Sequence, residues 1–175
     1  CVNAAMDYMV RITPPRLLMT ALTHFDGVAM EALDQCLHLD GHEAVATPEA
    51  MLRRAHTQAS LGVNKGELEL TPSLIKSPAA FIATVLAVQQ NERMGNALPH
   101  LHKEVEFAYE LLQHFLGGDD LQMHDKAAMF IPASAELLLS GSRPALYSTT
   151  KPVQRKVQGP LVQASMDVIR RRLLE

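Results

Sequence analysis

Tryptophan is absent from this chain of 175 residues, and the other aromatic residues are scarce, with three tyrosines and five phenylalanines. The core must therefore be built from Leu, Ala, Val, Ile and nine methionines. Such a mixture favours helices over a β-sandwich, which draws on β-branched and aromatic residues. Alternation of polar and apolar residues extends over about four residues at most, from Glu67 to Leu70. The composition therefore predicts an all-α fold.

Cysteines and long apolar runs are also lacking. Cys1 and Cys36 are too few for a disulfide framework, so we expect a reducing, cytoplasmic location. The longest near-continuous apolar run, Ala79 to Val88, is about half the ~20 residues needed to cross a bilayer, so we expect no membrane span. Because the chain begins with Cys1 rather than Met, we expect a domain excised from a longer protein or a processed product.

Strong net charge is missing as well, since the formal charge is only −3. This balance argues against non-specific DNA binding and against a disordered tail. The length suits one domain over residues 1–175, which would bury roughly 70% of the surface that the unfolded chain exposes. We therefore expect a single compact helical bundle that needs no cofactor to hold it together.

Helix boundaries are marked by Ser or Thr before Pro and by Gly after apolar stretches. Together they predict about nine helices. These cover residues 4–12, 14–24, 27–39, 48–61, 72–76, 78–94, 98–116, 120–138 (with a break allowed at Pro132) and 160–174. The long irregular stretch 140–159 contains two prolines and many hydroxyl side chains, and it predicts an exposed loop or hinge before the last helix.

Apolar periodicity supports these helices. Within 98–116 one stripe of apolar residues recurs at steps of four and three, made by Leu101, Val105, Ala108, Leu112 and Phe115. A similar arc in 27–39 consists of Val28, Ala32, Leu33, Cys36, Leu37 and Leu39. We therefore expect Cys36 to be a small buried hydrophobic residue rather than a nucleophile paired with His38.

Charge is distributed unevenly along the chain. Between Leu17 and Leu52 there is no Lys or Arg, and six acids occur: Asp26, Glu31, Asp34, Asp40, Glu43 and Glu49. Between Leu137 and Met166 there is no acid, and four cations occur: Arg143, Lys151, Arg155 and Lys156. This segregation predicts surfaces of opposite sign, each suited to a complementary partner. Together with the hydroxyls of the same stretch, the cations form the predicted partner- or anion-binding set: Arg143, Ser148, Thr149, Lys151, Arg155 and Lys156.

Two small groups have the residue types of a metal site. His38, Asp40 and His42 can meet where Gly41 breaks the helix, although they lack the helical His-Glu-x-x-His spacing of zinc proteases. His124 and Asp125 form the His-Asp step found in metal-dependent phosphohydrolases, but a distant histidine would have to complete the set. We favour no metal at either group.

A third group, His102, Glu106, Glu110 and His114, is spaced four residues apart and so shares one helix face. This face lies opposite the apolar stripe of 98–116, so we expect it to face water. A basic triplet, Arg170 to Arg172, spreads around a helix and is expected to interact with its dipole.

No complete catalytic set emerges from these patterns. The favoured hypothesis is a non-enzymatic protein-interaction module, such as an adaptor or scaffold, that uses the basic loop, the acidic surface or both. The first alternative is a helical metal-dependent hydrolase built on the His/Asp groups. The second is a nucleic-acid-binding domain, suggested by the turn-like residues 59–64, although the acidic residues that follow would repel phosphates.

Overall fold

The computed structural model describes residues 2–36, 55, 59, 71–89, 98, 100–116, 131–141 and 153–174. These residues contain helices and no strand, so the all-α prediction is confirmed. The described helices are α1 (Val2–Ile12), α2 (Pro15–Cys36), α4 (Ser73–Gln89), α5 (His102–Leu116), α7 (Ala135–Leu139) and α8 (Val153–Leu174). The expected count of about nine is not supported by this part of the chain, and most of the helix predicted over 48–61 lies outside it.

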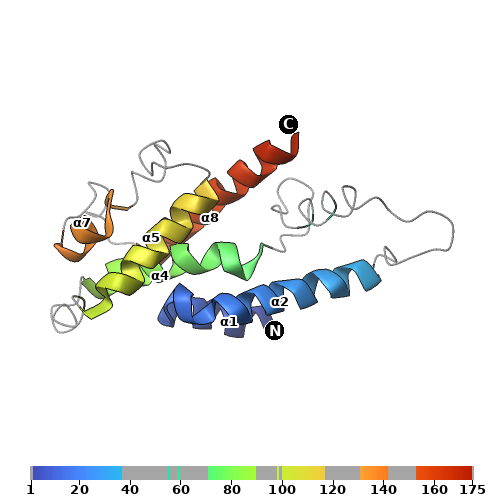
Figure 1. The fold of residues 1–175 in the computed structure, drawn as a ribbon, viewed down its shortest axis with the longest axis horizontal. Coiled ribbons are helices and arrows are strands. Elements are labelled where there is room, and N and C mark those ends of the chain that lie inside the picture. The colour runs from blue at the N-terminus through green and yellow to red at the C-terminus, as the bar shows by residue number, and fades with distance from the viewer. Residues whose placement is uncertain are drawn as a thin grey trace.

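Helix α4 occupies the centre of the fold and contacts α1, α2, α5 and α8. Figure 1 shows α5 and α8 running in the same diagonal direction across α4, with α1 and α2 along its other side. Three alanines of α4, Ala79, Ala80 and Ala83, are fully buried, and their small side chains let neighbouring helices approach closely. Larger residues such as Ile82 of α4 and Leu112 of α5 fill the remaining space of the main core.

Helix α5 has the predicted apolar stripe. Val105, Ala108 and Leu112 are fully buried in the main core, while Leu101 and Phe115 at its two ends are half-buried. The opposite face of α5 is exposed, as expected. The periodicity of this segment therefore predicted both the helix and its orientation.

One predicted boundary is wrong, because the single helix α2, Pro15–Cys36, runs through the gap expected between the helices 14–24 and 27–39. Gly27 lies inside this helix on an exposed surface, where a methyl group would meet nothing within 4 Å. A glycine inside a helix costs about 1 kcal/mol relative to alanine. A helix of this length tolerates one such cost without ending there.

A second predicted boundary is also wrong. A new helix was expected to start at Pro78, but α4 continues through this residue. Pro78 has no N–H for the carbonyl of Leu74, four residues earlier. The hydroxyl of the buried Ser77 donates a hydrogen bond to that carbonyl instead, at 3.1 Å. The Ser-Pro pair thus maintains the helix rather than starting one.

The third wrong boundary is the start of the last helix. This start was expected at Pro160, but α8 begins at Val153 and has Pro160 in its interior. Residues 153–159 of the predicted 140–159 loop are therefore helical. At the other end of that segment, Gly141 follows α7 with φ +84°, a conformation that favours glycine. Residues 142–152 lie outside the described part of the chain.

Residues 131–134, around Pro132, are not helical and α7 starts after them, whereas residues 120–130 of the helix predicted over 120–138 lie outside the described residues. Ser134 caps α7 by accepting a hydrogen bond from the N–H of Leu137. The hydroxyl of the buried Tyr109 on α5 donates to the carbonyl of Pro132 at 3.0 Å, and the Gln89 side chain of α4 donates to the carbonyl of Leu138. These bonds attach α7 to the core.

None of the helices in the described residues combines the length and the apolar character that crossing a bilayer requires.

Candidate functional site

The outer face of α1 is apolar. Tyr8, Met9 and Ile12 are 61%, 41% and 52% exposed, and Ala5 is exposed beside them. These four residues recur at steps of three and one, so they lie on one side of the helix. We refer to Ala5, Tyr8, Met9 and Ile12 as the α1 face.

The inner side of α1 contains both apolar and charged residues. Val10 is buried with Leu22 of α2 and Ala80 of α4, and Met6 packs against them. On the same side, the carboxylate of Asp7 lies 3.7 Å from the Lys76 ammonium of α4.

Arg11 also lies on that inner side, half-buried, and its Nε atom is shielded from solvent without a hydrogen-bond partner. Helix α1 thus has one exposed arc that is wholly apolar, while its two charged residues, Asp7 and Arg11, are half-buried outside this arc. A surface helix normally has its apolar stripe against the core and polar residues outward, so α1 departs from this pattern by having a second apolar arc that is exposed.

Exposed apolar side chains continue beyond α1. Leu17, in the first turn of α2, is 67% exposed, and Val28 further along α2 is 50% exposed. Arg16 beside Leu17 is paired with Glu104 of α5, with 3.5 Å between the guanidinium and the carboxylate. This pair attaches the start of α2 to α5 and leaves Leu17 facing outward.

The predicted acidic surface is placed only in part. Glu31 is exposed and Asp34 is half-buried on α2, whereas Asp40, Glu43 and Glu49 lie outside the described residues. Asp26 has a structural role, because its two carboxylate oxygens accept hydrogen bonds from the N–H groups of Ser73 and Leu74, at 2.7 and 2.9 Å. It thereby caps the first turn of α4 from another helix. Its carboxylate is occupied by this cap, so Asp26 belongs to the packing of α2 on α4.

The predicted burial of Cys36 is wrong. Cys36 is an exposed free cysteine at the last residue of α2, and Val28 and Ala32 of the same predicted arc are exposed as well. Leu33 of the predicted arc is half-buried, as are Phe25, Ala29 and Met30, which the prediction did not include. The sequence identified a helix here but assigned the wrong face to the core.

The predicted basic set lies mostly beyond the described residues. Arg155 and Lys156 belong to the first turns of α8 rather than to a loop. The other members, Arg143, Ser148, Thr149 and Lys151, lie outside the described part of the chain. The set is therefore still a prediction, with its last two members now placed on a helix.

Both metal candidates also lie outside the described residues: His38, Asp40 and His42 in one group, His124 and Asp125 in the other. Within the ranges that the structure describes, no three His, Cys, Asp or Glu side chains come together in a way that could hold a metal ion.

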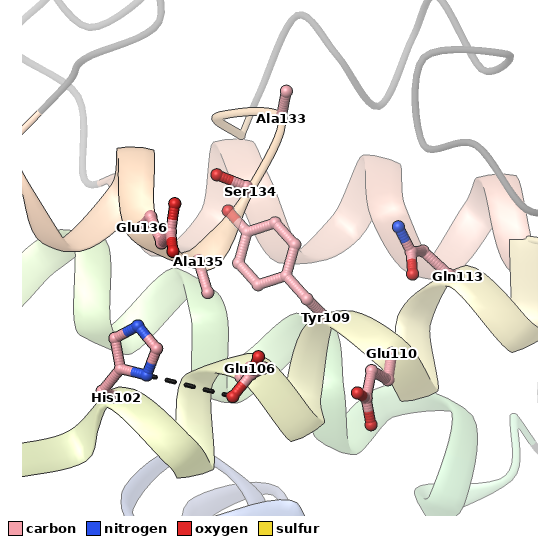
Figure 2. Close-up of a pocket in the computed structure, with 9 residues that line it drawn as sticks. All are labelled: His102, Glu106, Tyr109, Glu110, Gln113, Ala133, Ser134, Ala135 and Glu136. Atoms are coloured by element: carbon pink, nitrogen blue, oxygen red, sulfur yellow. Dashed lines mark ion pairs between the residues drawn. The ribbon is translucent and has the colours of Figure 1, made fainter.

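The solvent-facing side of α5 borders an open depression of about 230 Å³ between α5 and the turn before α7. Figure 2 shows His102, Glu106, Tyr109 and Glu110 on the α5 side and Glu136 across from them. His102 Nδ1 lies 3.9 Å from a carboxylate oxygen of Glu106, and both side chains are about half exposed. The predicted exposure of His102, Glu106, Glu110 and His114 is confirmed.

A scan against protein-family models found no match, and neither the search of curated proteins nor the search of solved structures found a similar protein. Function must therefore be argued from the surfaces of this chain.

Sequence reasoning missed the α1 face. The signal was present, since Ala5, Tyr8, Met9 and Ile12 share one arc of a helical projection that excludes Asp7 and Arg11. Such a stripe is ordinarily assigned to the core, and periodicity alone does not say on which side of a helix the rest of the protein lies.

Proposed function

We propose that this chain is a non-enzymatic protein-interaction module, of the adaptor or scaffold type, and that the α1 face is part of the surface that binds its partner. The observation that carries the proposal is the exposed apolar arc of α1, on a helix that also buries Val10 in the core. Tyr8, Met9 and Ile12 are exposed on this arc, and neither Asp7, which pairs with Lys76, nor the half-buried Arg11 belongs to it.

Exposed clusters of large apolar side chains mark surfaces that bind other proteins, because their burial in a complex is favourable by about 25 cal/mol per Å². Tyrosine and methionine are among the residues enriched at such interfaces. Tyr8 and Met9 offer a rigid ring and a flexible thioether side by side. Ile12 and the nearby Leu17 extend the apolar character over the connection into α2.

The segregated charge is a second element of the proposal. No cation follows Arg16 in α2, and Glu31 is exposed on that helix. A partner with basic residues around an apolar segment would therefore be repelled by no Lys or Arg of α2 other than Arg16. Electrostatic complementarity of this kind contributes mainly to the rate and specificity of association.

The experiment is affinity purification of the tagged chain from the cells that express it, with quantitative mass spectrometry of the bound proteins. Ile12→Lys places a charge in the α1 face, and Leu137→Lys is the matched control, because Leu137 is a similarly exposed apolar residue on α7, 46% against 52%. We expect Ile12→Lys to reduce at least one reproducible partner tenfold or more, while Leu137→Lys retains it. Equal recovery with both variants would remove the α1 face from the proposal.

A second arm tests the basic set. Replacing Arg143, Lys151, Arg155 and Lys156 together with Glu should abolish capture of a partner that binds through this set, while helix content measured by circular dichroism stays unchanged. Unchanged capture would remove the basic set and leave the α1 face as the proposed contact.

The two alternatives from the sequence are a metal-dependent hydrolase and a nucleic-acid-binding domain. Apart from Ala59, the residues that suggested them lie outside the described ranges. No described contact favours either of them. They are addressed by metal analysis of protein purified without chelator, and by the salt dependence of oligonucleotide binding.

A further inference from the structure

We draw no further inference here: the strongest candidate, the open depression that Glu106 and Glu110 of α5 form with Glu136 of α7, is an acidic cluster, and nothing else in the described residues points to a ligand for it.

Discussion

Helices α4 and α1 pack against each other, yet their apolar side chains have opposite environments. Helix α4 is surrounded by four helices, and eleven of its residues are buried. Helix α1 contacts α4 through Met6 and Val10 and exposes Tyr8, Met9 and Ile12. The difference teaches that apolar residues in this chain have two environments: those of α4 hold the fold together, and those of the α1 face are exposed, where we propose that a partner covers them.

The sharpest test of this comparison is the same substitution in both helices. Ile82 of α4 is fully buried, and Ile12 of α1 is 52% exposed. Ile82→Ala should lower the free energy of unfolding by roughly 2–5 kcal/mol, because it removes buried methyl groups and leaves a cavity. Ile12→Ala should change the same quantity by less than about 0.5 kcal/mol. Urea denaturation followed by circular dichroism measures both free energies of unfolding. Equal losses of stability in the two variants would contradict the difference between α4 and α1.

The attachment of α2 to α4 provides the next largest effect. Asp26→Ala removes the acceptor for the N–H groups of Ser73 and Leu74 and should cost about 1–2 kcal/mol of unfolding free energy. Glu31→Ala is the control, because it removes an exposed acid from the same helix and should cost less than about 0.5 kcal/mol. If both variants unfold at the same urea concentration, the cap does not stabilise α4.

The passage of α4 through Pro78 depends on Ser77. Ser77→Ala removes the hydroxyl that donates to the Leu74 carbonyl, so we expect a loss of about 1 kcal/mol in unfolding free energy. Ser140→Ala removes a similar hydroxyl bond, to the Leu137 carbonyl, from an exposed position and should have a smaller effect. Thermal denaturation of the two variants ranks them, and the reverse order would contradict this role of Ser77.

The smallest expected effect lies on the exposed side of α5. Glu106→Gln removes the charge that pairs with His102, and both side chains are about half exposed. Solvent screens such a pair, so the unfolding free energy should change by less than about 0.5 kcal/mol at neutral pH. A loss above 1 kcal/mol would mean that the exposed face of α5 contributes to the fold as the buried helices do.

The fold was predictable from the sequence where local signals agreed with one another. The stripe from Leu101 to Phe115 defined α5 and its buried side, and Pro132 lies in the non-helical residues directly before α7. The Ser77-Pro78 and Gly159-Pro160 steps misled, because proline is favoured in a first helical turn but was found inside α4 and α8. In α4, Ser77 supplies a replacement hydrogen bond and the surrounding core stabilises the helix, neither of which is visible in local sequence.

The candidate surface was predictable only in part. Charge segregation is a property of the sequence and led to the acidic and basic sets. Spatial arrangement then gave Asp26 a structural role as the cap of α4, which depends on residues 47 and 48 positions away. The orientation of α1 depends likewise on Lys76, Leu22 and Ala80, which are distant in sequence, so its exposed apolar face could not be inferred from the pattern of α1 alone.

The most direct test of the central claim is the accessibility of the α1 face with and without a partner. A cysteine is introduced as Ile12→Cys in a chain with Cys1→Ser and Cys36→Ser, because Cys36 is itself exposed. Its rate of maleimide labelling is measured for the isolated chain and for the complex recovered by affinity purification, with Leu137→Cys as the control. The account predicts rapid labelling of both positions in the isolated chain and at least tenfold slower labelling at position 12 alone in the complex. Equal rates at position 12 in the two states would contradict it.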